Sequence, residues 1–261
     1  MMGIRTFFLT VALIAASAAS MLAQESSDGA PAYSFDETDL VVVVGGSGRT
    51  GQLVIRQLTE MGVQVRATTR DVEAARDDIG ADYDWVAADA SDTEALAAAI
   101  DGATYVVSAI GNSKDPENVD YKGVANAVDA AKAANVKRFV LISSGGVTHG
   151  PEHFLNRTFN NLLEWKFKGE EHLRSSGLDY AVVRPNGLLD ALDVESKQAG
   201  IYLLQGDGRF PGLITRENVA RVAIEALINP DASRKTFEAI TAFVVMPDQW
   251  TTQFQYLNPD E

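Results

Sequence analysis

The chain has no cysteine, and it has 3 histidines in 261 residues. The lack of cysteine excludes a disulfide framework, a thiol nucleophile and a cysteine metal site. His149 and His153 are four residues apart with Glu152 between them, which is a metal-ligand spacing. Pro151 interrupts this segment, however, and no third ligand is evident. We therefore predict no metal site and interpret the two histidines as part of a loop near a substrate entrance.

Positive charge is also scarce, because 22 Lys and Arg residues face 36 Asp and Glu residues and the formal net charge is -14. A general nucleic-acid-binding protein is excluded, since the phosphate backbone would be repelled. A local basic pocket for one phosphorylated small molecule is not excluded. The apolar share of 46% and the charged share of 22% are typical of a globular protein and rule out a disordered chain.

Long hydrophobic runs are absent except near the N-terminus. Arg5 is the only charge in residues 1–23, and an apolar run from Phe7 to Ala19 follows it. This pattern indicates a signal peptide and export to the periplasm or the medium, with cleavage at Ala16-Ser17-Ala18 or, alternatively, at Ala23. The alternative is an uncleaved membrane anchor, whereas an organelle presequence would normally carry more arginine. Residues 24–38 are polar and are interpreted as a linker.

From Leu40 onward, short β-branched runs alternate with longer amphipathic segments. This alternation is typical of an α/β protein with a doubly wound parallel sheet, the Rossmann fold. We expect this domain to span residues 39–242, with a small C-terminal substrate region, and leave residues 243–261 unassigned. The expected strands are 40–44, 63–69, 83–87, 105–110, 137–143, 178–184, 201–204 and 236–240, and the expected helices are 52–61, 92–100, 118–134, 154–176 and 216–228.

The strongest chemical signal is the segment GGSGRTG at residues 45–51, which separates the first expected strand from the first helix. Gly45 suits a tight turn, Gly48 lets the backbone approach a pyrophosphate, and Gly51 lets the helix pack against the strand. The free N–H groups at the start of the helix favour an anion. The spacing G-x-x-G-x-x-G in this position predicts a dinucleotide site; the alternative is a purely structural turn.

The residues after the next two strands indicate which dinucleotide is bound. Arg70 ends the second strand, where an arginine accommodates the 2′-phosphate of NADP and a carboxylate would accept from the ribose of NAD. We therefore predict NADP rather than NAD, with Arg49 as a second positive charge. Asp71 is either an acceptor or a partner of Arg70, and Arg70 itself has the alternative of a solvated surface residue. Asp89 is placed at the adenine edge or, alternatively, at a helix N-terminus.

Five segments together resemble an atypical short-chain dehydrogenase/reductase, and within that family the NAD(P)H-binding group with biliverdin/flavin reductase-like and NmrA-like proteins. They are GGSGRTG, the step Asp120-Tyr121-Lys122-Gly123, VKRFVLISSGG, WKFKGEEHLRSSGLDYAVVRPNGL and ITRENVARVAIEAL. The resemblance covers residues 40–227. It implies cofactor contacts from Gly45, Ser47, Gly48, Arg49, Thr50, Gly51, Arg70, Asp89, Ala90, Ser108, Ala109, Gly111, Arg184, Pro185 and Asn186. It also implies catalytic roles for Ser143, Ser144 and Lys168.

One departure from the family pattern concerns the proton donor. Family members that reduce carbonyls use Tyr-x-x-x-Lys, but the residue four positions before Lys168 is Glu164. Carbonyl reduction by a tyrosine relay is therefore not expected. Hydride transfer to a flavin-like or quinone-like ring does not need that tyrosine, because the second proton can come from solvent. The simplest alternative is that Glu164 and Lys168 form an i,i+4 ion pair on a helix.

These observations lead to two hypotheses about function. The first is an NADP-dependent oxidoreductase that acts on a small conjugated or aromatic acceptor. The second is a non-catalytic NAD(P)-binding protein that senses redox state or supports assembly of a partner complex. Aromatic residues such as Trp165 and Phe167 cover more than one helix face and are interpreted as core or subunit contacts, so a homo-oligomer is an open alternative.

Overall fold

The computed structural model describes residues 33–191, 200–207, 212–242 and 249–261. Phe35–Glu261 form one compact unit. The predicted signal peptide or anchor at residues 1–23 and most of the predicted linker lie outside the described residues. Within the part that is described, no helix is both long and apolar enough to cross a membrane.

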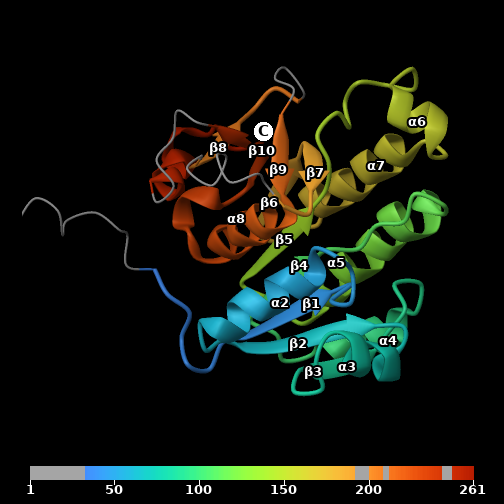
Figure 1. Ribbon diagram of the computed structural model, residues 1–261, viewed down its shortest axis with the longest axis vertical. Helices are drawn as coiled ribbons and strands as arrows, with labels where there is room; N and C mark the ends of the chain where they lie inside the picture. Colours follow the sequence, from blue (N-terminus) through green and yellow to red (C-terminus); the bar gives the residue numbers. More distant parts are fainter. Residues whose placement is uncertain (1–32, 192–199, 208–211, 243–248) are drawn as a thin grey trace, which may run out of the picture. The chain divides into compact units, whose positions relative to one another are not determined.

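The described residues form an eight-stranded sheet in the order β3-β2-β1-β4-β5-β6-β10-β8 (Figure 1). All neighbouring pairs are parallel except β10 and β8, which are antiparallel. The strands are β1 (Leu40–Val44), β2 (Gln64–Thr69), β3 (Asp84–Ala87), β4 (Tyr105–Ser108), β5 (Arg138–Ile142), β6 (Tyr180–Pro185), β8 (Gly200–Leu204) and β10 (Lys235–Ala242). The predicted doubly wound α/β fold is confirmed.

Helices cover both faces of this sheet (Figure 1). On one face lie α2 (Gly51–Glu60), α3 (Val72–Asp78) and α8 (Arg216–Ile228), and on the other lie α4 (Thr93–Ile100), α5 (Val124–Ala133) and α7 (Leu162–Ser175). Each face of the sheet has its own hydrophobic core, and strand β1 contributes to both. Val41 and Val43 belong to the core under α2, α3 and α8, and Val42 and Val44 belong to the core under α4, α5 and α7. Full burial of each valine contributes about 1.5–3 kcal/mol, so a continuous apolar run is stable only in such a central strand.

Two expected helices differ from those in the structure. The expected helix 118–134 begins with a π-helical turn, η1 (Glu117–Gly123), before α5. The expected helix 154–176 was wrong as a continuous element, because it is divided into α6 (Phe154–Thr158) and α7. Asn160 and Asn161 between them have φ angles of 51° and 59°, a left-handed conformation that asparagine tolerates and a helix cannot include.

The chain also contains small elements that the sequence pattern did not indicate. The seven-residue helix α3 follows β2 and is capped by Asp71. A separate two-stranded sheet pairs β7 (Gly187–Leu189) with β9 (Leu213–Thr215). Short helices η3 (Pro230–Ala232) and η4 (Trp250–Tyr256) complete the set of described elements.

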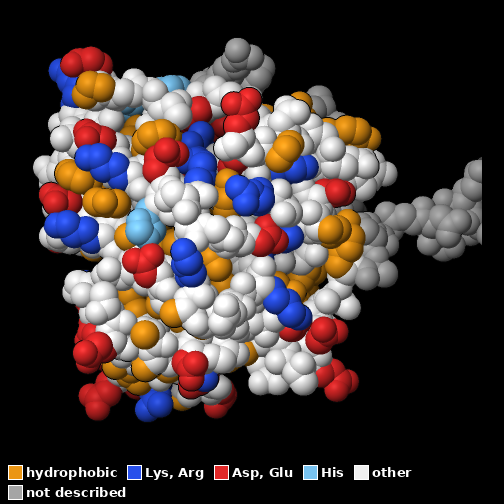
Figure 2. All heavy atoms as spheres, turned by 180° about the vertical axis from the view of Figure 1, so that it is seen from behind, with side chains coloured by type: hydrophobic (Ala, Val, Ile, Leu, Met, Phe, Trp, Pro, Cys, Tyr) orange, Lys and Arg blue, Asp and Glu red, His pale blue; other side chains and the backbone are white. Residues whose placement is uncertain are grey.

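The described end of the chain, residues 249–261, packs against the sheet unit. Phe254 of η4 meets Phe237 of β10 edge to face, with ring centroids 5.2 Å apart. Asp260 accepts hydrogen bonds from the Tyr180 hydroxyl at 2.9 Å and the Thr236 hydroxyl at 2.6 Å. The end of the chain therefore stabilises β6 and β10. On the face seen in Figure 2, acidic and basic side chains are interspersed.

Candidate cofactor cleft

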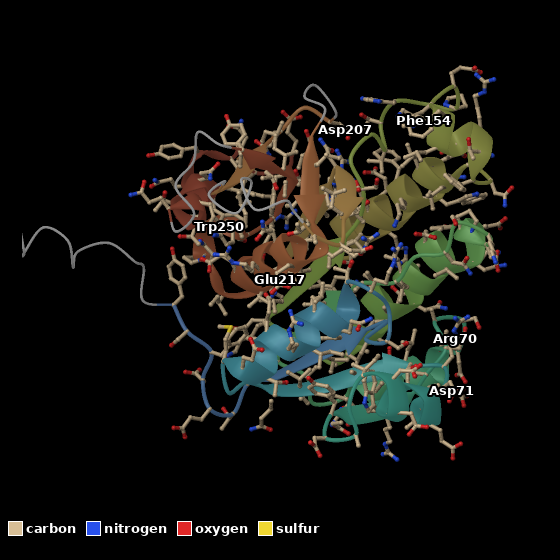
Figure 3. The ribbon with its side chains drawn as sticks, viewed as in Figure 1. Arg70, Asp71, Phe154, Asp207, Glu217 and Trp250 are labelled. Carbon is tan, nitrogen blue, oxygen red and sulfur yellow. The ribbon has the colours of Figure 1, made fainter. Side chains whose placement is uncertain are left out.

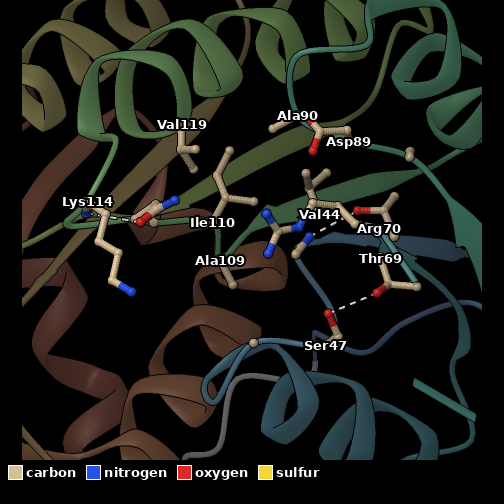
Figure 4. Close-up of a pocket in the computed structure, with 16 residues that line it drawn as sticks. Val44, Ser47, Thr69, Arg70, Asp89, Ala90, Ala109, Ile110, Lys114 and Val119 are labelled. Carbon is tan, nitrogen blue, oxygen red and sulfur yellow. Dashed lines mark hydrogen bonds between the residues drawn. The ribbon is translucent and has the colours of Figure 1, made fainter. Parts of the chain in front are cut away.

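A cleft of about 510 Å³ opens at the carboxyl ends of β1, β2 and β4 (Figure 4). It lies where the strand order reverses on either side of β1, which is the position at which open α/β sheets bind ligands. The lining residues are Val44, Gly45, Ser47, Gly48, Thr68, Thr69, Arg70, Ala88, Asp89, Ala90, Ala109, Ile110, Gly111, Asn112, Lys114 and Val119.

The glycine turn forms one wall of this cleft, and its backbone is held from several sides. Gly45 has a φ of +83°, and its N–H donates to the Thr68 hydroxyl at 3.0 Å. The N–H of Gly48 donates to the carbonyl of Gly45 at 3.0 Å. A β-carbon on Gly51 would collide with that same carbonyl oxygen. The turn therefore requires glycine at its first and last positions, as the spacing predicted.

The start of α2 follows the cleft-lining residues Ser47 and Gly48, and no side chain caps it. Thr50, at the N-cap position, makes no side-chain hydrogen bond to the helix, whereas Asp71 caps α3 and Asp92 caps α4. Uncapped N–H groups at a helix N-terminus are a ready anion site. A β-carbon on Gly48 would lie 3.2 Å from the Gly45 carbonyl oxygen, so the turn leaves little room for a side chain. This donor set fits a pyrophosphate.

Arg70 and Asp89 lie at one end of the cleft, and Lys114 lies at the other (Figure 4). Arg70 is exposed, and its charge together with hydrogen bonds affects Asp89. Side-chain and backbone hydrogen bonds from Ser91, opposed by slight burial and assisted by Arg70, lower the pKa of Asp89. The Thr69 hydroxyl donates to Ser47 Oγ at 3.0 Å and connects β2 with the glycine turn.

Asp71 has a role in the structure that neither alternative named. Its carboxylate accepts from the Ala74 N–H at 3.0 Å and caps α3, so it is not turned to Arg70. Arg70 and Asp71 lie together at the end of β2, far from Asp207 and Phe154 in Figure 3. Asp71 does not line the cleft, although the second oxygen of its carboxylate is not used by this cap.

The end of β4 supplies the floor of the cleft. Ala109 and Gly111 line it, whereas Ser108 lies fully buried beneath them. Among the described residues, the Ser108 hydroxyl has no hydrogen-bond partner. Asn112 donates its N–H to Asp120 Oδ2 at 2.9 Å, which attaches the strand end to η1.

Of the two lysines Lys166 and Lys168 on α7, Lys166 lies nearer to this floor, while Lys114 lines the cleft itself. Lys166 Nζ lies 2.7 Å from Asp120 Oδ1, and a β-carbon on Gly111 would lie 3.5 Å from the same ammonium. Lys168 forms the i,i+4 ion pair with Glu164 at 3.0 Å and lies over the Trp165 ring at 4.0 Å. Two residues along a helix turn the side chain by about 200°, so the two lysines cannot share a face.

Ser143 and Arg184 belong to a buried network behind the cleft. The Ser143 hydroxyl donates to Glu170 Oε1 at 2.5 Å, and Arg184 donates to both oxygens of Glu170 at 3.1 and 2.6 Å. Arg174 adds a further hydrogen bond to Glu170 at 2.7 Å. The carboxylate of Glu170 is fully buried, so this network is chiefly a means of compensating its charge.

The loop after β5 is held by a second carboxylate. Asp207 accepts from the N–H groups of Gly146 and Thr148, both at 2.6 Å. Its backbone oxygen lies 2.8 Å from His149 Nε2. The same loop meets the end of β6, since the Gly145 N–H donates to the Pro185 carbonyl at 3.0 Å. The loop after β5 and the end of β6, both predicted to flank the nicotinamide, are therefore hydrogen-bonded to each other.

Eight of the predicted residues come together as cleft lining, and the rest lie around or behind it. The eight are Gly45, Ser47, Gly48, Arg70, Asp89, Ala90, Ala109 and Gly111. Arg49 pairs instead with Asp190, 3.6 Å away, in an exposed position. Ser144 donates its hydroxyl to the Gly145 carbonyl, and a β-carbon on Gly145 would collide with Asn186 Oδ1. Within the described residues, no three His, Asp or Glu side chains gather as a metal site.

Some cleft residues were missed by the sequence reasoning. Thr68, Thr69, Asn112 and Lys114 line the cleft although no motif marks them. Their position at or just after the carboxyl ends of β2 and β4 is the signal that would have found them, because those ends face the ligand in this fold. Asn126 donates to the Ala90 carbonyl at 2.9 Å, so its role is a hydrogen bond to backbone.

A family match and two similar proteins indicate the family of this chain. Residues 45–230 match the family described as NAD(P)H-binding. Sanguinarine reductase of Eschscholzia californica is 30% identical over 82% of this chain and 97% of its own length. Photosystem II assembly factor Ycf39 of Trieres chinensis is 30% identical over 76% of this chain and 62% of its own.

A third relative and a solved structure complete the comparison. The chloroplastic protein TIC 62 of Pisum sativum is 30% identical over 84% of this chain, which spans 46% of that longer protein. The crystal structure of an oxidoreductase from Lactococcus lactis superposes with a TM-score of 0.72 and 19% identity, over 85% of this chain and 99% of that one. The structural likeness supports the fold.

Proposed function

We propose that this chain, which belongs to the NAD(P)H-binding family, is an NADPH-dependent reductase of a small conjugated or aromatic acceptor. The observation that carries the proposal is the glycine turn, which joins β1 to an uncapped α2 and opens on a cleft of about 510 Å³. When bound, the cofactor supplies the hydride. The similarity to sanguinarine reductase supports a reductase activity.

The chain's own residues are assigned to parts of the cofactor by their place along the cleft. The N–H groups of Ser47, Arg49 and Thr50 bind the pyrophosphate, and Asp89 and Ala90 contact the adenine. Ala109 and Gly111 support the nicotinamide ribose. Ser143 and Arg184 act through Glu170, which holds the ends of β5 and β6 in register with each other.

NADPH is proposed rather than NADH because of the charges at the end of β2. Arg70 is exposed in the cleft, and the carboxylate of Asp71 is engaged in capping α3. A charge-assisted hydrogen bond between arginine and phosphate contributes about 1.5–3 kcal/mol. Because Arg70 is exposed, solvent reduces this contribution. Arg70→Ala should therefore weaken NADPH binding about tenfold and leave NADH binding unchanged. Arg76→Ala, on the exposed side of α3, is the matched control.

The decisive experiment measures binding before turnover. The full chain is titrated with NADPH and followed by nucleotide fluorescence, and NADPH oxidation is then measured with flavin, quinone and aldehyde panels. The proposal expects binding and turnover with a flavin or quinone, but not with simple aldehydes. Failure to bind NADPH would refute it.

A second function is favoured by the absence of the proton-donating tyrosine and by the similarity to an assembly factor. Neither Glu164 nor Leu162, four residues before Lys168 and Lys166, is a tyrosine. In this alternative the chain binds NAD(P)H without catalysis and reports redox state or supports assembly of a complex. Tight NADPH binding without turnover on any acceptor would favour it over the reductase.

The proposed N-terminal targeting segment at residues 1–23 is either a cleaved export signal or a membrane anchor. The relative TIC 62 is chloroplastic, which supports a third route, import into an organelle. NADPH is an intracellular cofactor, so the compartment decides whether it is available. N-terminal sequencing of the purified protein, together with cell fractionation, distinguishes these fates.

A further inference from the structure

The pair formed by Lys166 and Asp120 lies directly behind the cleft floor. A β-carbon on Gly111, a cleft-lining residue, would be 3.2 Å from Asp120 Oδ1 and 3.5 Å from Lys166 Nζ. Glycine at this position therefore keeps the approach to both groups open. The Lys166 side chain is 14% exposed, whereas that of Asp120 is fully buried. The side chain of Lys166 is thus the less buried member of the pair.

The pair is held in place by the close packing of α7 against η1. Asp120 lies in the π-helical turn η1, a form of helix that often occurs at functional sites. Gly169 of α7 packs against this turn, because a β-carbon there would lie only 2.6 Å from the Asp120 carbonyl oxygen. Beside it, Tyr121 stacks on Trp165 with centroids 6.0 Å apart and an interplanar angle of 18°. The two elements are therefore locked in one register.

Each charged group of the pair stabilises the other. A buried carboxylate is costly unless it is paired and hydrogen-bonded, and Asp120 has the Lys166 ammonium on one oxygen and the Asn112 N–H on the other. The carboxylate in turn holds the ammonium at the end of β4. Lysine supplies up to three N–H donors, so Lys166 can contact Asp120 and still present a donor to a ligand.

We propose that Lys166 is the proton donor of the reductase and that Asp120 is its positioning residue. This inference rests on the proposed reductase function. The acceptor gains a hydride, with its electron pair, from the C4 position of the nicotinamide, and a proton from Lys166 Nζ as that N–H bond breaks. Water then returns a proton to Lys166. The ammonium also stabilises negative charge that develops on the acceptor before the proton moves.

The location of Lys166 is tested without any activity measurement. The free protein and the NADP⁺ complex are treated briefly with acetic anhydride, and acetylation of each lysine is measured by mass spectrometry. Lys166 should be protected by NADP⁺, while Lys168 and Lys122 should react equally in both samples. Asp120→Asn should raise the acetylation rate of Lys166 in the free protein, because the ammonium loses its ionic partner. Equal labelling of Lys166 with and without NADP⁺ would overturn the assignment.

The catalytic role is tested by three lysine variants. Lys166→Met should lower kcat about 100-fold or more and leave the NADPH dissociation constant within about threefold, as expected for loss of a general acid. Lys166→Arg should recover part of the rate because it restores the positive charge. Lys122→Met, on an exposed lysine paired with Glu117, is the matched control and should retain the full rate.

The outcomes separate this proposal from the one on which it rests. If wild-type protein does not bind NADPH, both fail. If it binds and turns over an acceptor while Lys166→Met keeps the wild-type rate, the reductase stands and the lysine assignment is wrong. A rate loss with Lys168→Met instead of Lys166→Met would also overturn it, as would tight NADPH binding without turnover on any acceptor.

Discussion

Replacement of Gly48 by alanine should separate cofactor binding from folding. The new β-carbon would lie 3.2 Å from the Gly45 carbonyl oxygen and 3.9 Å from that of Ala109. The first distance is tight and the second is ordinary contact, so the turn needs to move by only a few tenths of an ångström. Overpacking of this small size costs the fold about 1 kcal/mol.

The cost to binding should be larger. In the proposed binding mode, the methyl group would occupy the space through which the pyrophosphate approaches the N–H groups of the turn, and each charge-assisted hydrogen bond contributes about 1.5–3 kcal/mol. Loss of one to two of them corresponds to a rise of about 100-fold in the NADPH dissociation constant. Fluorescence titration measures the binding, and urea unfolding measures the stability of the same sample.

A control with a similar folding cost makes the result interpretable. Gly102 has a φ of +75° with no atom within 4 Å of an added β-carbon, and it does not line the cleft. Gly102→Ala should therefore lose about 1–2 kcal/mol of stability through backbone strain and bind NADPH normally. If Gly48→Ala binds NADPH within threefold of the wild type, the pyrophosphate does not lie on this turn.

Further predictions concern the fold around the cleft. Gly51→Ala should destabilise the protein by about 3 kcal/mol or more, because its β-carbon would collide with the Gly45 carbonyl oxygen. A urea unfolding midpoint equal to that of the wild type would contradict this. Glu170→Gln should cost about 3–5 kcal/mol in the same assay, since it removes the buried partner of Arg184, and a loss below about 1 kcal/mol would show that the charge is dispensable. Burial raises the pKa of Asp207, but hydrogen bonds from Thr148 outweigh it, and the pKa lies below its ordinary value of 3.8. The stability from this carboxylate is therefore complete above pH 3.8 and lost as pH falls through the lower folded pKa, and Asp207→Asn should flatten the acid limb of a stability-against-pH curve.

The cleft was predictable from the sequence where local pattern and function coincide. The run LVVVV followed by GGSGRTG marks a buried strand and a phosphate-binding turn with no need for long-range information. The residues at the ends of β2, β3 and β4 follow from the same topology, because parallel strands present their carboxyl ends at one edge. Arg70, Asp89 and Gly111 lie in the cleft for this reason.

The lysine was not predictable in the same way, because the phase of a helix depends on where the helix begins. Lys166 and Lys168 both match a helical pattern, and the sequence does not show that Asn160 and Asn161 interrupt the segment. Lys166 rather than Lys168 pairs with Asp120 because Gly169 of α7 packs against η1, an interaction across some fifty residues of chain. The small sheet of β7 and β9 was missed for a similar reason, since three-residue strands carry almost no periodic signal.

The position of β10 has a consequence for how the protein is made. Strand β10 lies between β6 and β8 in the sheet, and Asp260, the penultimate residue, is bonded to β6 through Tyr180. During translation the first half of the sheet emerges early, while β6 keeps a bare edge until β10 at residues 235–242 has left the ribosome. Nascent chains stalled before residue 235 should therefore need chaperone protection, although the strands that carry the candidate cleft are already complete.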